Sequence, residues 1–177
     1  MTTVVAIEDE FGMTMIADSQ INANDRAYFH PDMVKIVERN KYVIGVAGRV
    51  NALQALHNSW NPPSLASNYR GTLYTFVITK VVPSLRAFFD DAKMFSDKEK
   101  DEGGIFSILL ALNGNVFEID EDFSVSRRGD GYYAIGSGAD YALGALMAGA
   151  THTHAIEIAS YNDLNTHAPF IEITQSK

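Results

Sequence analysis

Residues 2–18 read TTVVAIEDEFGMTMIAD, two apolar runs separated by an acidic turn that contains a glycine. The first run, Thr2–Ile7, is rich in β-branched residues, which is typical of a buried strand. The second run, Met13–Asp18, follows closely enough to form an antiparallel hairpin with the first. The chain is therefore expected to begin with a β-hairpin whose open end carries Thr2 and Asp18.

The next part of the chain predicts a second hairpin and then two helices. Ser19–Met33 shows weak periodicity and is expected to form a loop. Apolar residues recur at helical spacing after Gly48, and Pro83 is expected to kink or split the longer helix. The expected elements are strands Val34–Glu38 and Tyr42–Ala47, a short helix over Val50–Trp60, a helix over Thr72–Met94 and a charged surface loop over Phe95–Gly104.

Strands return in the second half, followed by a second pair of helices. Asn113-Gly114 between two apolar runs is a strong signal for a hairpin turn, and a further strand pair is expected around Gly129–Gly131. Thr153 is the expected N-cap of the last helix. The expected elements are strands Ile105–Leu112, Val116–Ile119, Phe123–Arg127 and Tyr132–Ile135, helices Gly138–Gly149 and Thr153–Asn162, and a final strand Phe170–Thr174.

Blocks of strands that alternate with helix pairs predict an α+β fold. The strands are expected to form two antiparallel sheets stacked on each other, with a helix pair on each outer face. Parallel α/β folds alternate single strands with single helices and do not fit this order. A length of 177 residues, without an internal repeat or a low-complexity tract, predicts a single domain over residues 1–177.

The composition argues against several classes of function. The chain contains no cysteine, which rules out disulfides and thiol catalysis. The net charge is −8 and there is no basic block, so nucleic-acid binding is not expected. No apolar run approaches the roughly 18 residues of a membrane span, and the acidic N-terminus lacks the pattern of a signal peptide. We expect a cytoplasmic protein.

The N-terminus is the first candidate for chemistry. Removal of Met1 would place a hydroxyl and a free α-amine on one residue, Thr2. An α-amine has a pKa of about 7.7–8.0 and can take the proton of the hydroxyl near neutral pH. Many proteins begin with Met-Thr, so this feature by itself favours an inert terminus.

Other candidate residues lie at the ends of expected elements. Asp18 ends the second strand and is expected beside Thr2, where a paired Lys35 would lower the pKa of the hydroxyl and amine. The N–H of Gly48, at a strand-to-helix junction, suits an oxyanion hole. Taken singly, each residue has a structural alternative: a turn-forming aspartate, a solvated lysine, a turn glycine and, for Ser137, a helix N-cap.

Together, these features resemble the proteasome β-type family of N-terminal nucleophile hydrolases, and most of all the HslV-type peptidases. The order of the matching motifs extends over essentially the whole chain. The motifs are Thr2-Thr3-Val4-Val5, Ile16-Ala17-Asp18-Ser19, Val34-Lys35-Ile36, Val46-Ala47-Gly48, Ala134-Ile135-Gly136-Ser137-Gly138 and the spacing of Ala159, Asp163 and Thr166. The fold that this resemblance implies is the αββα sandwich (the Ntn-hydrolase fold).

The resemblance also implies a role for each residue of the inner site. Thr2 would be the nucleophile and its α-amine the base. Asp18 and Lys35 would form the charged pair beside them. The N–H of Gly48 would lie in the oxyanion hole, and Ser137 would bond near the Thr2 amine.

An outer network is implied at the end of the last helix. Asp163 and Thr166 would complete it, and backbone carbonyls nearby can hold a structural monovalent or divalent cation in such proteins. No cofactor is required by the implied reaction. His152 and His154, two residues apart at a helix start, are expected to be solvated rather than to bind a metal.

The implied function is that of a threonine-type endopeptidase that cleaves unfolded polypeptides through an ester on Thr2. The resemblance implies a homo-oligomer of hexameric or heptameric rings, stacked as two rings, with an AAA+ ATP-dependent unfoldase as partner. Two alternatives stay open. One is a proteasome-like ring protein without catalytic activity, and the other is an amidohydrolase of the same superfamily that acts on a small amide.

The substrate pocket is expected to include the apolar residues Ile21, Val46 and Val50, which would favour apolar P1 side chains. Two features depart from the family pattern. Arg49 follows Gly48 where many relatives carry a second glycine, and it would crowd or charge the substrate groove. The segment that leads to the expected catalytic lysine is one residue longer than usual.

Overall fold

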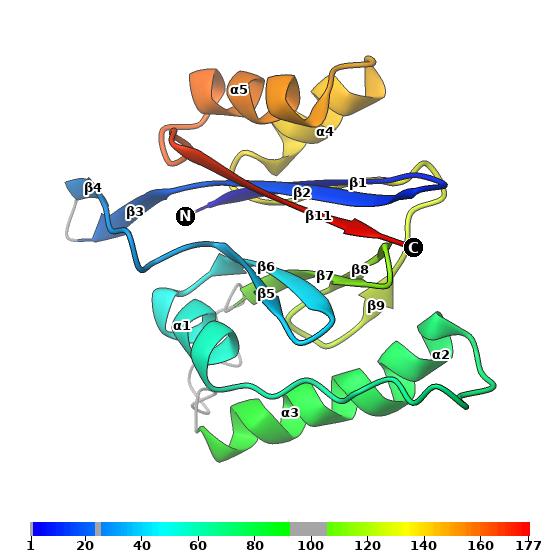
Figure 1. Ribbon diagram of the computed structural model, residues 1–177. Helices are drawn as coiled ribbons and strands as arrows, with labels where there is room; N and C mark the ends of the chain where they lie inside the picture. Colours follow the sequence, from blue (N-terminus) through cyan, green and yellow to red (C-terminus); the bar gives the residue numbers. More distant parts are fainter. Residues whose placement is uncertain (1, 24–25, 93–105) are drawn as a thin grey trace.

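A computed structural model describes residues 2–23, 26–92 and 106–177 of the chain. Two antiparallel β-sheets stack face to face, and helices cover both outer faces (Figure 1). This arrangement confirms the four-layer αββα sandwich that the order of elements predicts. The expected surface loop over Phe95–Gly104 lies outside the described residues.

The first sheet has four strands in the order β10–β1–β2–β11, and all neighbours are antiparallel. Val5 of β1 lies opposite Ile16 of β2, which confirms the first hairpin. The bounds of the strands are β1 Thr3–Glu8, β2 Gly12–Asp18, β10 Tyr132–Gly136 and β11 Phe170–Ser176.

The second sheet has five strands in the order β5–β6–β7–β8–β9. Positive φ angles at Asn113 (49°) and Gly114 (70°) fit a two-residue turn between β7 and β8, which confirms the hairpin expected there. The bounds of the strands are β5 Ile36–Arg39, β6 Tyr42–Gly48, β7 Phe106–Leu112, β8 Asn115–Ile119 and β9 Val125–Ser126.

Two expectations about the strands are wrong. The segments Phe123–Arg127 and Tyr132–Ile135 do not pair, because β9 joins β8 while β10 crosses to the other sheet and joins β1. The expected loop Ser19–Met33 contains a hairpin of two short strands, β3 (Gln20–Ala23) and β4 (Arg26–Phe29). All four residues of β4 are exposed, so the strand has no apolar alternation by which the sequence could reveal it.

The helices follow the sequence pattern with one difference. The long helix is divided near Pro83, as expected, because a π-helical turn separates α2 from α3 and Pro83 lies in the first turn of α3. The N-cap of the last helix is Thr151, whose hydroxyl accepts the N–H of His154 at 3.2 Å, and not Thr153. The bounds are α1 Val50–Asn58, α2 Leu73–Phe76, the π turn Val77–Val81, α3 Val82–Asp91, α4 Ala139–Met147 and α5 His152–Asn162.

Three apolar layers hold the sandwich together. Val4 of β1 faces the second sheet, while its neighbour Val5 faces α4 and α5, as expected from the alternation of side chains along a strand. A third layer, which includes Trp60 and Phe89, lies between the second sheet and helices α1 and α3. Among the helices that the structure describes, none has the length and apolarity needed to cross a bilayer.

Candidate active site

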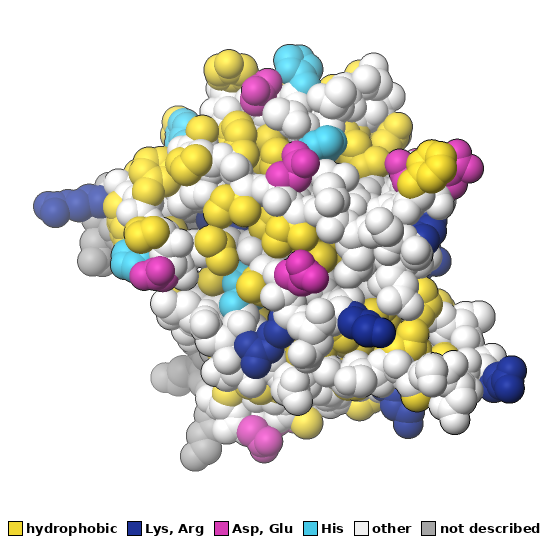
Figure 2. Space-filling view, in the orientation of Figure 1, with side chains coloured by type: hydrophobic (Ala, Val, Ile, Leu, Met, Phe, Trp, Pro, Cys, Tyr) yellow, Lys and Arg dark blue, Asp and Glu magenta, His cyan; other side chains and the backbone are white. Residues whose placement is uncertain are grey.

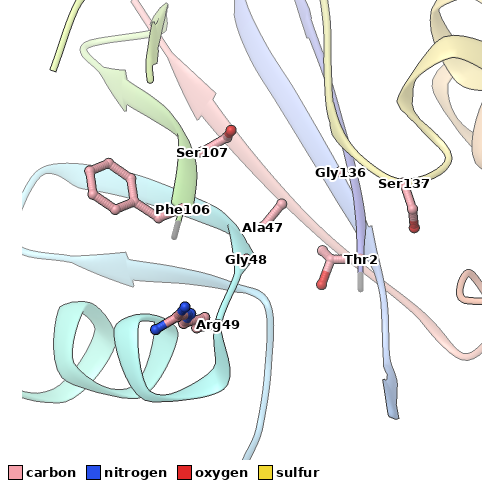
Figure 3. Close-up of a pocket in the computed structure, with 8 residues that line it drawn as sticks. All are labelled: Thr2, Ala47, Gly48, Arg49, Phe106, Ser107, Gly136 and Ser137. Atoms are coloured by element: carbon pink, nitrogen blue, oxygen red, sulfur yellow. The ribbon is translucent and has the colours of Figure 1, made fainter. Parts of the chain in front are cut away.

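Thr2 lies directly before β1 and is buried. Its carbonyl oxygen accepts the N–H of Ser137 at 2.9 Å. Gly136, with φ +97°, lies against the same oxygen, and a Cβ atom at this position would be only 1.8 Å away from it. Glycine at position 136 therefore allows β10 to fix the backbone of Thr2. Figure 3 shows the Thr2 side chain between Gly48 and Ser137.

A buried ion pair lies beside Thr2. Asp18 ends β2, and Lys35 immediately precedes β5. The Nζ atom of Lys35 is 2.8 and 2.9 Å from the two carboxylate oxygens of Asp18. The exposed fractions of the two side chains are 3% for Lys35 and 0% for Asp18. The carboxylate also accepts the backbone N–H groups of Thr3 at 2.8 Å and Gln20 at 3.1 Å, which fix its orientation.

Burial lowers the pKa of Lys35 from its usual value of 10.5, although the negative charge and hydrogen bonds of Asp18 act in the opposite direction. The pair therefore places a positive charge, held by the Asp18 carboxylate, close to the start of β1.

A second polar network links Thr3 to the end of α5. The carboxylate of Asp163 accepts the hydroxyl protons of Ser137 and Thr166, each at 2.6 Å. The Oγ1 atoms of Thr166 and Thr3 are 2.5 Å apart, and Thr3 Oγ1 also accepts the N–H of Gly138 at 3.1 Å. The network thus connects the first strand, the β10–α4 turn and the α5–β11 loop.

Asp163 carries a negative charge at neutral pH. Burial acts to raise its pKa, but hydrogen bonds from Ser137, Thr166 and Asn165 outweigh this effect, so the pKa is lowered from its usual 3.8. The hydroxyl proton of Ser137 is engaged by this carboxylate. The lone pairs of the same oxygen can therefore accept a hydrogen bond from an ammonium group near Thr2.

Two hollows meet at Thr2 and Gly48, which line both of them. The first is an open pocket of about 420 Å³ (Figure 3), and the second is smaller. The other residues of the first pocket are Ala47, Arg49, Phe106, Ser107, Gly136 and Ser137. The other residues of the second hollow are Gln20, Ile21, Asn22, Met33, Lys35, Val50 and Leu53.

The structure brings the expected site residues to one end of the sandwich, with one exception. Ile21 and Val50 line the second hollow, and their contact with a substrate stays a prediction. The expectation for Val46 is wrong, because its side chain is fully buried in the layer between the second sheet and α1. Val46 and Gly48 lie two residues apart on β6. The strand ends at Gly48, whose backbone lines both hollows together with Thr2.

Thr3 and Gly138 belong to the polar network, although the sequence analysis assigned them no role. Thr3 points to the opposite face of β1 from its neighbour Val4, which is the face that α5 covers. Gly138 approaches Thr3 so closely that a Cβ atom there would be 2.4 Å from the Thr3 hydroxyl. Strand alternation predicts the direction of Thr3, but only the tertiary structure shows that the end of α5 lies there.

The predicted cation remains a prediction. The carbonyl groups of Asp163, Leu164 and His167 already accept hydrogen bonds from Thr166, Gln20 and Ser19, respectively. A cation would have to use their second lone pairs or other carbonyl groups of the α5–β11 loop. Within residues 2–23, 26–92 and 106–177, no cluster of three or more His, Asp or Glu side chains could hold a metal ion.

Comparisons with known proteins support the fold and leave the chemistry open. No protein-family model and no curated protein matches the sequence. The chain superimposes on BPH of Thiobacillus denitrificans with a TM-score of 0.79, at 16% identity over 98% of this chain and 97% of that chain. A second structure of that protein, in complex with epoxomicin, matches equally well, with 16% identity, a TM-score of 0.79 and 98% of both chains covered.

Two further structures extend the comparison. HslV from Trypanosoma brucei has a TM-score of 0.69 and 18% identity over 99% of each chain. Anbu, an ancestral beta-subunit from Yersinia bercovieri, has a TM-score of 0.71 and 13% identity over 98% of this chain and 81% of that chain. Over nearly its whole length, the chain therefore has the four-layer fold of the proteasome β-type proteins, the Ntn-hydrolase fold that BPH, HslV and Anbu share.

Proposed function

We propose that the chain is a threonine-type peptidase in which Thr2 is the nucleophile after removal of Met1. The observation that carries this proposal is the position of Thr2, at the junction of two hollows and beside the buried Lys35–Asp18 pair. Buried ionisable groups with a perturbed pKa gather at catalytic sites more often than elsewhere. A hydroxyl next to a base and a pocket is the arrangement that acyl transfer requires.

The proposed reaction has two steps. The Oγ1 atom of Thr2 attacks the carbonyl carbon of a peptide bond, and the free α-amine of Thr2 takes the hydroxyl proton. The N–H of Gly48 stabilises the negative oxygen that forms, and the leaving amine receives the proton as the C–N bond breaks. Water then attacks the ester on Thr2, which releases the second product and restores the hydroxyl.

The surrounding charges support these steps. The Lys35 ammonium stabilises the alkoxide that develops on Thr2, and Asp18 holds the ammonium in place. Ser137 accepts a hydrogen bond from the α-amine when the amine is protonated, while its own hydroxyl group donates a hydrogen bond to the Asp163 carboxylate. With Met1 attached, the nitrogen of Thr2 would be an amide without a basic lone pair, so activity should follow the fraction of processed chains.

Intact-mass spectrometry combined with a fluorogenic peptide assay tests this proposal. We expect hydrolysis by the processed protein, and its loss on Thr2→Ala with normal folding, because the change removes a single hydroxyl at a strand start. Thr153→Ala, on the exposed side of α5, is the matched control and should keep full activity. Epoxomicin is bound in a structure of the Thiobacillus protein. It should inhibit peptide hydrolysis by the unchanged chain and should not label Thr2→Ala covalently.

Four results would contradict the proposal. Full activity of Thr2→Ala, or of protein that retains Met1, would rule out the N-terminal nucleophile. Processed protein that cleaves no peptide would favour a ring protein without catalytic activity, and cleavage confined to small amides would favour an amidohydrolase.

We also propose that the protein acts on unfolded polypeptides as a closed ring of six or seven copies, stacked as two rings and served by an AAA+ ATP-dependent unfoldase. Exposed apolar side chains on the helical layer support contacts between copies. The exposed fractions are 47% for Tyr141 and 66% for Met147 of α4, and Figure 2 shows further hydrophobic side chains at the surface over the β3–β4 hairpin. Light scattering that gives the monomer mass of 19.5 kDa at every concentration would contradict the ring.

A further inference from the structure

We propose that Asn22 and Asn165 are positioning residues that link the second hollow to the Asp163 carboxylate, an inference that rests on the proposed peptidase function. Asn22 lies on β3 and lines that hollow, whereas Asn165 follows α5 and lines neither hollow at Thr2. The Nδ2 atom of Asn22 donates a hydrogen bond to Oδ1 of Asn165 at 2.6 Å. The Nδ2 atom of Asn165 donates in turn to Oδ1 of Asp163 at 3.2 Å.

Gln20 adds a third amide at the wall of the hollow, so that Gln20, Asn22 and Asn165 form an amide series. Gln20 is buried and lies two residues before Asn22 on β3, which places both side chains on the same face of the strand. Its Nε2 atom donates to Oδ1 of Asn22 at 2.8 Å and to the carbonyl oxygen of Leu164 at 3.1 Å. Both amide hydrogens of Gln20 therefore hold the wall of the hollow against the α5–β11 loop.

The two ends of the amide series determine its direction. The carbonyl group of Leu164 and the ionised carboxylate of Asp163 can only accept hydrogen bonds. Nitrogen rather than oxygen must therefore face Leu164 at the Gln20 end and Asp163 at the Asn165 end. Asn22 lies between these two amides, accepting from the first and donating to the second. Each amide of the series consequently donates towards the negative charge of Asp163.

The amide series supports the side of the Asp163 carboxylate that does not contact Ser137. Oδ1 accepts the backbone N–H and the Nδ2 group of Asn165, each at 3.2 Å. Oδ2 accepts hydrogen bonds from the hydroxyl groups of Ser137 and Thr166, each at 2.6 Å. Aligned hydrogen bonds polarise and strengthen one another. A change at Asn22 should therefore alter how firmly Asp163 holds the Ser137 hydroxyl.

The position of the hollow gives the amide series a role in turnover. Gln20 and Asn22 form part of the same wall as Thr2. A substrate side chain that enters the hollow would lie against these amides, while its peptide bond lies at Thr2. The amide series would then keep Ser137 in place during attack, which affects the rate of the reaction more than the binding of the substrate.

A double-mutant cycle on stability tests the link without requiring hydrolysis. Asn22→Ala and Asp163→Asn are made singly and together, and urea denaturation at neutral pH gives the unfolding equilibrium constant of each protein. We expect Asp163→Asn to change this constant about three- to fivefold less in the Asn22→Ala protein than in the unchanged protein, whereas independent residues would give equal changes. The same cycle in an Asn165→Ala background should show no coupling.

Kinetics with the fluorogenic peptide separate positioning from binding. Asn165→Ala should lower kcat about tenfold, in line with the loss of a hydrogen bond to a charged group. KM should be nearly unchanged, because Asn165 lines neither hollow. Asn162→Ala is the matched control and should keep both constants, because Asn162 is exposed and its amide donates to the carbonyl group of Ile158 within α5 at 2.8 Å.

The inference fails if the cycle shows no coupling between Asn22 and Asp163, if the coupling survives in the Asn165→Ala background, or if Asn165→Ala retains the full kcat. Coupling in the cycle without hydrolysis of any peptide would uphold the link between the hollow and Asp163 and reject the peptidase function alone.

Discussion

Each end of the β1–β2 hairpin carries an ion pair. The two pairs have nearly the same N···O distance but differ in how much of each side chain is exposed to solvent. At one end, Lys35 and Asp18 are 2.8 Å apart, with 3% and 0% of their side chains exposed. At the other end, Arg127 and Glu8 are 2.7 Å apart, with 37% and 10% exposed. Glu8 also accepts the N–H of Val116 at 2.9 Å, which ties the two sheets together.

The difference suggests a structural role for the Arg127–Glu8 pair, whereas a gain in stability does not explain why the Lys35–Asp18 pair is present. A surface pair contributes at most about 1 kcal/mol and costs little to form. A buried pair loses several kcal/mol of solvation for each ion, so apolar residues of the same size would often stabilise the fold as well or better. The Lys35–Asp18 pair lies beside Thr2 and a pocket, which makes a role in chemistry the simpler explanation for its presence.

Removal of the buried ammonium should have the largest effect. Lys35→Met keeps most of the side-chain volume and leaves the Asp18 carboxylate buried without its cation. We expect the free energy of unfolding to fall by about 3 kcal/mol and peptide hydrolysis to be lost. Urea denaturation followed by circular dichroism measures the first effect, and the fluorogenic assay measures the second.

A double variant tests whether charge is the cause. Asp18→Asn combined with Lys35→Met removes both charges and keeps an oxygen for the N–H groups of Thr3 and Gln20. We expect most of the lost stability to return while the protein stays inactive. A double variant that is no more stable than Lys35→Met would show that lost packing, and not an unpaired charge, weakened the protein.

The layers and the inner site could be predicted from the sequence because they depend on local patterns. Two continuous apolar runs predict strands β1 and β2, the acidic turn between them predicts their hairpin, and the hairpin places Asp18 beside Thr2. The sequence could not predict which strand pairs with β10. The residues that connect β9 to β10 do not indicate which of the two sheets the next strand joins. The β3–β4 hairpin was missed for a related reason, because its exposed second strand shows no apolar period.

The outer network shows a second kind of limit. The position of Asp163 could be expected from its place after the last helix. Its link to Thr3 runs through Thr166, which is 163 residues away from Thr3 in the sequence. Val46 was misplaced because an apolar residue on β6 can face the core or the pocket with the same sequence pattern. The strand pairing and the packing of α1 decide between these directions, and neither is a local property.

The same comparison of a buried with an exposed position can be made for two carboxylates, Asp163 and Asp130. Hydrogen bonds hold the pKa of Asp163 below its usual value at the buried end, and Arg128 does the same for the exposed Asp130. A carboxylate whose pKa is lowered by folding stabilises the protein above its unfolded pKa, and this contribution is lost as the pH falls through the folded pKa. We expect Asp163→Asn to cost about 1–2 kcal/mol at pH 7.

The pH dependence distinguishes this electrostatic effect from a packing effect. The stability difference between the unchanged protein and Asp163→Asn should narrow as the pH is lowered from about 5 towards 2, because the carboxyl group becomes neutral in both states. Denaturant titrations at several pH values measure it, with Asp130→Asn as the exposed control, for which we expect a much smaller difference because solvent screens the contact with Arg128. A difference that is independent of pH would mean that Asp163 acts through shape and not through charge.

The smallest effect is expected at the exposed end of the hairpin. Arg127→Ala removes one partner of Glu8, but Lys177 remains 3.7 Å from the same carboxylate. Water can solvate the carboxylate oxygen that the substitution exposes. We expect a loss of at most about 1 kcal/mol, and a smaller loss at high salt, because the Debye length shrinks from about 10 Å at 0.1 M to about 3 Å at 1 M. Salt should leave the effect of Lys35→Met nearly unchanged, since the buried pair is shielded from solvent ions. Thermal unfolding of both variants in 0.05 and about 1 M sodium chloride measures this contrast, and equal salt sensitivity would mean that solvent reaches the Thr2 end as easily as the Glu8 end.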